Sequence, residues 1–145
     1  MKPLRVGVIG AGAVTATVHL PILTRRRDLF EVAGLYDLNL GAVNALGERF
    51  GISTEKRFSD LAEMFSNTEL DAVLILNSGS HADLVKLALQ AGLEVFCEKP
   101  LAYTKRELHE IREALKQSKN HLMIGYMKSH DPSVKRTAEL ITKEG

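Results

Sequence analysis

The chain has 145 residues, of which 45% are hydrophobic and 26% are charged. These values are typical of one ordinary globular domain with a core of its own. The net charge of +1 gives no reason to expect a nucleic acid or an anionic membrane as a partner. The single cysteine, Cys97, excludes a disulfide framework and favours a reducing, cytoplasmic setting.

The N-terminus invites comparison with a secretion signal, because a basic start at residues 1–5 precedes the apolar stretch 6–16. Glycines interrupt that stretch, however. No segment of the sequence approaches the ~18 apolar residues that a membrane-spanning helix requires. We therefore expect neither a secretion signal nor a membrane span.

Strand and helix signals alternate along the chain. In chain order we expect a strand at 4–9, a helix ending near residue 27, a strand at 31–36, a helix at 40–50, a weak strand at 56–58, a short helix capped by Ser59 or Asp60, a strand at 71–76, a helix at 81–92, a strand at 94–97, a helix at 104–118, a strand at 121–127 and a last helix capped by Asp131. Pro21 should break the first helix near His19 and Leu20, because proline lacks a backbone donor. Six strands alternating with helices predict a Rossmann-type, doubly wound parallel sheet with helices on both faces, spanning 1–145 as one domain.

Two glycines stand where the first strand gives way to the first helix. Gly10 permits a tight turn there, and Gly12 lets the backbone approach a pyrophosphate. Ala13 and Val14 then begin the helix, whose free N–H groups favour phosphate. This strand–turn–helix context predicts a dinucleotide site.

Thr15 stands at the third position of the glycine pattern, where a glycine or alanine is usual. Two explanations remain open from the sequence. Either Thr15 is a packing variant that sets helix and strand slightly further apart, or its hydroxyl contacts a phosphate.

Asp37 ends the second strand, where a carboxylate can accept hydrogen bonds from the hydroxyls of an adenosine ribose. An anion at this position also repels a 2′-phosphate. We therefore expect NAD rather than NADP as the cofactor. The alternative is an ordinary aspartate at the start of a loop.

The stretch "EVFCEKPLA" is more specific than the glycine pattern, because it indicates a protein family and not only a fold. Glu98, Lys99 and Pro100 resemble the EKP signature of the Gfo/Idh/MocA oxidoreductases, a family that includes glucose–fructose oxidoreductase and inositol dehydrogenase. The stretches "GAGAVTATVHLPIL", "LNSGSHADLVKLALQAGLEVFCEKPLA" and "GYMKSHDPSVKRTAELI" resemble the same family. The resemblance covers essentially the whole chain.

The resemblance implies an oxidoreductase that transfers a hydride between NAD(P) and a sugar, cyclitol or related polyol. Lys99 would be the catalytic residue, beside both nicotinamide and substrate hydroxyl. The cofactor-binding residues would be Gly10, Gly12, Ala13, Val14, Asp37, Asn77, His81, Glu98, Lys99 and Pro100. His81 is equally well explained as a helix cap, the Lys99–Pro100 bond is either cis or trans, and no metal site is predicted.

The family also carries a C-terminal α/β substrate domain, which we expect to be absent from this chain. That domain would supply most substrate contacts and the main interface of a homo-oligomer. An apolar patch is expected where it would pack, with Met127, Val134, Ala138 and Ile141 as candidates.

Ser129 and His130 depart from the arginine and aromatic residue common there in the family, which leaves the substrate undefined. A non-catalytic NAD-sensing module and one half of a split enzyme remain alternative functions.

Overall fold

The computed structural model describes residues 2–144. Its strands are β1 (Leu4–Ile9), β2 (Phe30–Tyr36), β3 (Arg57–Phe58), β4 (Ala72–Ile75), β5 (Glu94–Cys97) and β6 (Leu122–Ile124). Its helices are α1 (Leu20–Arg25), α2 (Leu40–Phe50), α3 (Leu61–Asn67), α4 (Ala82–Gln90), α5 (Lys105–Gln117) and α6 (Pro132–Glu144). Shorter helical turns are η1 (Thr15–His19), η2 (Thr54–Lys56) and η3 (Met127–His130).

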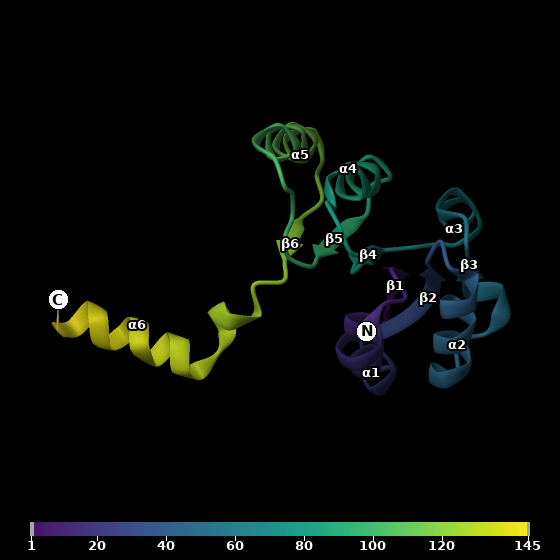
Figure 1. Cartoon of the computed structure of the whole chain (residues 1–145), viewed down its shortest axis with the longest axis horizontal. Coiled ribbons are helices and arrows are strands. Elements are labelled where there is room, and N and C mark those ends of the chain that lie inside the picture. Colours follow the sequence, from purple (N-terminus) through teal and green to yellow (C-terminus); the bar gives the residue numbers. More distant parts are fainter. Residues whose placement is uncertain (1, 145) are drawn as a thin grey trace.

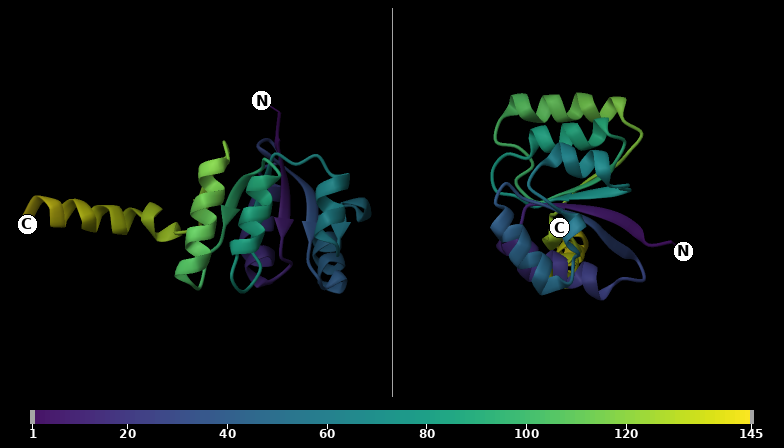
Figure 2. Two further views of the ribbon diagram at one scale, coloured as in Figure 1. Left: turned by 90° about the horizontal axis from the view of Figure 1, so that it is seen from above. Right: turned by 90° about the vertical axis from the view of Figure 1, so that its right-hand side faces the viewer.

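All six strands are parallel, in the order β3-β2-β1-β4-β5-β6. The chain therefore winds outward from β1 in one direction and then, from β4, in the other. Helices α1 and α2 cover one face of the sheet, and α3, α4 and α5 cover the opposite face (Figure 1; Figure 2, right). The predicted doubly wound Rossmann fold is confirmed.

Each face of the sheet has its own hydrophobic core. Leu20, Leu35 and Val43 are fully buried on the side of α1 and α2, whereas Met64 and Val85 are fully buried on the other side. Burying one such side chain contributes about 1.5–3 kcal/mol. The alternation of apolar strands and amphipathic helices in the sequence therefore produces this three-layer packing.

The first helix breaks where Pro21 predicts it, although the form of the break differs from a simple kink. Residues 15–19 form a π-helical turn, and α1 restarts at Leu20 with Pro21 in its first turn. The sixth strand is shorter than the predicted 121–127. It ends at Ile124 because its neighbour β5 ends opposite it at Cys97.

Helix α6 projects away from the sheet (Figure 1, yellow; Figure 2, left). Asp131 caps it by accepting a hydrogen bond from the Ser133 N–H at 2.8 Å, as the sequence predicts. Every side chain from 132 to 143 is exposed, Val134 and Ile141 among them. Within residues 2–144, no helix combines the length and the apolar character that crossing a membrane demands.

Candidate functional site

The strand register brings the predicted site residues to one edge of the sheet. Ile9 pairs with Tyr36 on one side and with Ile75 on the other, and Ile75 pairs in turn with Cys97. The loops after β1, β2, β4 and β5 therefore leave the sheet side by side, at its carboxyl edge. Ligands of open α/β sheets bind in this position, where the strand order reverses.

A cleft of about 660 Å³ lies at this edge, between the loops after β1, β2 and β4. Six of the predicted cofactor residues line it: Gly10, Gly12, Ala13, Val14, Asp37 and Asn77. Tyr36, Leu38, Ser78 and Leu84 also line it and were not predicted as site residues. They flank the predicted residues in the sequence, so extending each motif by one or two positions would have found most of them.

Gly10 has a φ of +106°, which side chains other than glycine rarely adopt. A Cβ atom on Gly10 would lie 2.6 Å from the backbone nitrogen of Asn77. The tight turn therefore needs glycine for both its conformation and its contact with the β4 loop. By contrast, a Cβ atom on Gly12 would meet no atom within 4 Å, since Gly12 faces open space in the cleft.

The carboxylate of Asp37 joins the loops after β1 and β2. One oxygen accepts a hydrogen bond from the Ala11 N–H at 2.8 Å, and the other accepts from the Asn39 N–H at 2.9 Å. A carboxylate oxygen can accept two hydrogen bonds. Each oxygen thus keeps acceptor capacity for a ligand hydroxyl in the cleft. Burial raises the pKa of the neighbouring Tyr36, and the charges of Asp37 and Asp60 raise it further.

Thr15 is fully buried, and its hydroxyl donates to the Gly10 carbonyl oxygen at 2.6 Å. The structure therefore supports the packing explanation, in which Thr15 ties the glycine turn to the helix. The alternative contact with a phosphate is wrong for this structure, because the hydroxyl has no access to the cleft.

His81 lies behind the cleft, with only 1% of its surface exposed. Its Nε2 is 2.7 Å from the carbonyl oxygen of Asn77, and its side chain makes no capping bond to α4. The predicted helix-cap position is confirmed, because His81 is the N-cap residue of α4 and its carbonyl oxygen accepts from the Val85 N–H at 2.9 Å, although its side chain does not cap the helix. A direct cofactor contact is not supported by this burial. His81 instead fixes the position of Asn77.

The loop after β4 is also tied to the start of α5. Glu107 accepts hydrogen bonds from the backbone N–H groups of Tyr103 and Thr104, at 2.9 and 2.8 Å. The hydroxyl of Ser80 and these N–H groups lower the pKa of Glu107 to about 2. Thr104 and Glu107 form a capping box at the start of α5, and Ser80 links this helix start to the loop after β4.

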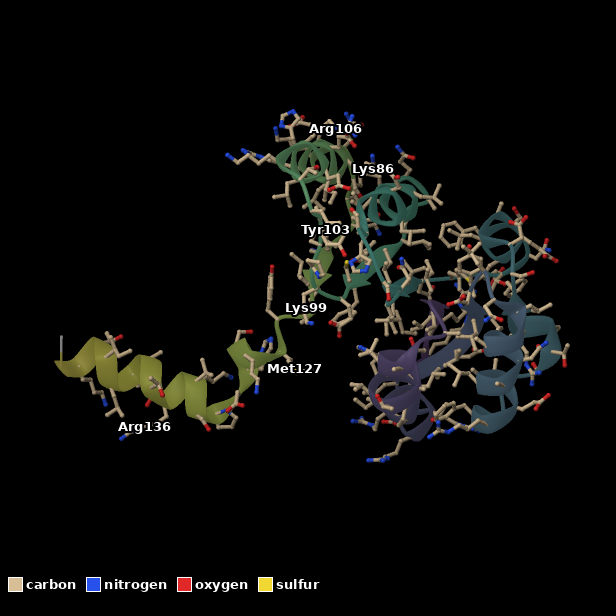
Figure 3. The ribbon with its side chains drawn as sticks, viewed as in Figure 1. Lys86, Lys99, Tyr103, Arg106, Met127 and Arg136 are labelled. Atoms are coloured by element: carbon tan, nitrogen blue, oxygen red, sulfur yellow. The ribbon has the colours of Figure 1, made fainter. Side chains whose placement is uncertain are left out.

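Glu98, Lys99 and Pro100 follow β5 further along the same edge, and they line no part of the cleft described above. The Glu98 N–H donates to the Ile75 carbonyl oxygen at 2.9 Å, which extends the pairing of β5 with β4 by one residue. Lys99 is exposed beyond the sheet edge (Figure 3). The Lys99–Pro100 peptide bond is cis.

A smaller cavity of about 190 Å³ lies beside Glu98, between the ends of β5 and β6. Its lining includes His19, Phe96, Tyr126 and His130. His19 was not predicted as a site residue. Two features of the sequence pointed toward it: its place beside Pro21, where the first helix was expected to break, and its position in the stretch "GAGAVTATVHLPIL" that resembles the family.

Cys97 ends β5 as a fully buried thiol. Burial raises its pKa to about 12, and the charge of Glu98 adds to this effect. It is therefore an unreactive core residue. Within residues 2–144, no three His, Cys, Asp or Glu side chains form a group that would hold a metal ion.

Comparison with known proteins agrees with this geometry. The family model described as "Oxidoreductase family, NAD-binding Rossmann fold" matches residues 4–126. Inositol 2-dehydrogenase from Salmonella typhimurium is 32% identical over 130 residues, which cover 88% of this chain and 38% of that protein. Inositol 2-dehydrogenase 3 from Saccharopolyspora erythraea is 31% identical over 144 residues, 98% of this chain and 41% of that protein. The chain thus spans about two fifths of the length of these relatives.

Solved structures show the same arrangement. The myo-inositol 2-dehydrogenase from Lactobacillus plantarum has a TM-score of 0.86 and 27% identity, covering 99% of this chain and 42% of that one. A 3-ketoreductase from Actinomadura kijaniata, in complex with TDP-benzene and NADP, has a TM-score of 0.84 and 27% identity, covering 97% of this chain and 44% of that one. With residues 4–126 matching the family model and the glycine turn, Asp37 and the EKP loop gathered at one sheet edge, the chain belongs to the Gfo/Idh/MocA oxidoreductase family and holds its NAD-binding Rossmann domain.

Proposed function

We propose that this chain is the cofactor-binding part of an oxidoreductase that transfers a hydride between NAD and a sugar, cyclitol or related polyol. The observation that carries the proposal is the strand register, which sets the glycine turn, Asp37, Asn77 and the Lys99 loop along one edge. An extended dinucleotide lying along this edge would reach from the cleft at β1 and β2 to the loop after β5.

The residues of the cleft fit the adenosine and phosphate parts of such a cofactor. Gly12 leaves open space beside the first N–H groups of a helix, which lack acceptors within the helix. Asp37 keeps acceptor capacity for ribose hydroxyls. The Oδ1 atom of Asn77 has no hydrogen-bond partner within residues 2–144 and belongs to a residue that lines the cleft. We propose NAD rather than NADP, because the Asp37 charge repels a 2′-phosphate.

In the proposed reaction, the bound nicotinamide supplies the acceptor for the hydride. Lys99 would donate a hydrogen bond to the substrate hydroxyl and stabilise the negative charge that builds on its oxygen. A lysine can also move this proton when its surroundings favour the neutral amine. Glu98 and Pro100 would hold the backbone that carries Lys99.

We propose a polyol as the substrate because the relatives of this chain are named inositol dehydrogenases. A polyol presents a row of hydroxyl groups, one of which Lys99 would hold. A homo-oligomer and a cytoplasmic location complete the proposal. The single buried cysteine agrees with a reducing compartment.

The test is the substitution Lys99→Ala in the full-length protein that carries these residues. Removing a group that acts on the reacting hydroxyl should lower kcat by about 100-fold or more, while NADH binding changes less than about threefold. Lys119→Ala is the matched control, since Lys119 is also exposed but lies in the loop between α5 and β6. A loss of NADH affinity at unchanged kcat would make Lys99 a binding residue only.

A further inference from the structure

A histidine of the first helix and the glutamate of the EKP loop form a partly buried pair that the proposed reaction does not use directly. The Nε2 of His19 lies 3.1 Å from Oε1 of Glu98, and the two side chains are 14% and 12% exposed. They lie 79 positions apart in the sequence. The pair therefore joins the first helix to the loop that carries Lys99.

The π-helical turn η1 determines where His19 lies. His19 is its last residue, and the fully buried Leu20 follows it. The imidazole ring meets the ring of Phe96 on β5 edge-on, with centroids 5.4 Å apart and an angle of 60° between the planes. π-Helical turns are rare and often occur at functional sites, where they redirect a side chain.

Glu98 is held on several sides. Its N–H donates to Ile75, its Oε1 meets His19, and its Oε2 accepts the N–H of Lys99 at 3.2 Å. A Cβ atom on Gly125, at the end of β6, would lie 3.2 Å from that same Oε2. The carboxylate is thus oriented by its surroundings, and one of its oxygens reaches the backbone of Lys99.

We infer that His19 is a positioning residue for Lys99. By donating from Nε2 to Oε1, His19 fixes the Glu98 carboxylate so that Oε2 receives the Lys99 N–H. The Lys99 backbone, and with it the direction in which the ammonium group leaves the sheet edge, then has one preferred geometry. This inference rests on the proposed function only for the catalytic importance of that geometry.

Two variants of His19 separate the hydrogen bond from the ring contact. His19→Phe keeps an aromatic ring against Phe96 and removes the donor. His19→Gln keeps a donor nitrogen at the distance of Nε2 and removes the ring. Glu98→Gln tests the partner, because its amide cannot offer acceptor oxygens to both His19 and Lys99.

The measurement is amide hydrogen exchange by NMR on the 145-residue chain, with Lys99 as the reporter. The exchange rate of Lys99 should rise about 10-fold in His19→Phe and in Glu98→Gln, because a hydrogen bond to a charged group is lost or loosened. It should stay within about threefold of the native rate in His19→Gln. The amide of Leu76, which donates to Ile9 at the same sheet edge, should not change and serves as the internal control.

An unchanged Lys99 rate in His19→Phe would overturn the inference. So would equal rises in His19→Phe and His19→Gln, or equal rises at Lys99 and Leu76, since each would indicate general loosening. In the full-length protein, His19→Phe should lower kcat more than it raises the KM for NAD, with His19→Gln restoring most of kcat. NADH titration of the same samples keeps the two proposals apart. Failure to bind NADH contradicts the proposed function, whereas NADH binding with an unchanged Lys99 rate contradicts only the role of His19.

Discussion

Gly10 and Gly12 stand two positions apart in one loop and have different physical roles. Gly10 has a positive φ and lies against the backbone of Asn77, so its lack of a side chain serves the fold. Gly12 has free space around it, so we propose that its lack of a side chain serves the approach of a ligand. The two positions therefore provide a matched pair of alanine substitutions.

We predict that Gly10→Ala lowers the free energy of unfolding by about 2 kcal/mol or more, because it combines a strained φ with a backbone clash. Gly12→Ala should change this free energy by less than about 0.5 kcal/mol, yet weaken NADH binding at least 10-fold. Urea unfolding and NADH titration of both variants give the two quantities. Equal stability losses in the two variants would contradict the separation of roles.

The positions of candidate site residues could be predicted from the sequence where the signal is local. Gly10, Gly12 and Asp37 each follow directly on a strand, and the register places them in one cleft. His19 and His81 could not be placed in this way. The contact of His19 with Glu98 depends on a π-helical turn, and His81 is buried with its partners, the carbonyl oxygens of Asn77 and Leu101, in loops that are distant from each other in the sequence. Neither the π-helical turn nor the burial of His81 can be recognised from residue types or from their spacing in the sequence.

At the scale of elements, an ion pair between Arg5 on β1 and Asp71 before β4 joins the two strands at their amino ends, on the side of the sheet opposite the cleft. The guanidinium donates to the carboxylate at 3.0 and 2.7 Å, and the Arg5 N–H donates to it at 2.8 Å. The hydrogen bonds from Arg5 lower the pKa of Asp71 from 3.8 to about 2. This pair aligns the two central strands at their amino ends, and so helps to set the register that builds the cleft.

The lowered pKa of Asp71 predicts a pH dependence of stability. Because its pKa is lower in the folded state, the stabilisation is fully present above pH 3.8 and is lost as the pH falls toward 2. Asp71→Asn should therefore lower the free energy of unfolding by about 1 kcal/mol at pH 7, a value discounted for solvent screening. The difference from the native chain should vanish near pH 2. Urea unfolding of both chains between pH 7 and pH 2 measures this difference in the free energy of unfolding. A difference that persists unchanged at pH 2 would show that Asp71→Asn acts through packing rather than through the charge of Asp71.

Element boundaries followed the sequence closely where caps and periodicity agree. Helix α2 begins and ends at the predicted residues, since Asn39 caps its start and Gly51 adopts a left-handed conformation at its end. The length of β6 was not predictable from its own apolar run, because a strand ends where its neighbour stops offering partners. Pairing across the sheet, rather than local composition, decides that boundary.

At the scale of the whole molecule, α6 is the element that the domain leaves uncovered (Figure 1). Val134, Ala138 and Ile141 line a shallow groove of about 340 Å³ on this helix, and Met127 is exposed just before it. The exposure of the four predicted residues is confirmed. Contiguous exposed apolar surface commonly marks an interface.

We predict that the 145-residue chain self-associates through this helix at high concentration. Ile141→Lys should shift the equilibrium to the monomer, because a charge would be buried in the contact. Leu108→Lys on α5 is the control, since Leu108, like Ile141, is an exposed large aliphatic side chain, but it lies outside the patch on α6. Sedimentation equilibrium over a concentration series checks the prediction. A native chain that stays strictly monomeric would show that the patch does not bind a second copy of the chain.

The proposed function requires the carboxyl edge of the sheet to be a dinucleotide site. Calorimetric titration of the folded 145-residue chain with NADH and NADPH tests this directly. We predict one NADH bound per chain and roughly 10- to 100-fold weaker NADPH binding, the difference expected from hydrogen bonds to the charged Asp37. NADPH binding as tight as NADH binding would contradict the role of Asp37 alone. A folded chain that binds neither dinucleotide would contradict the central claim.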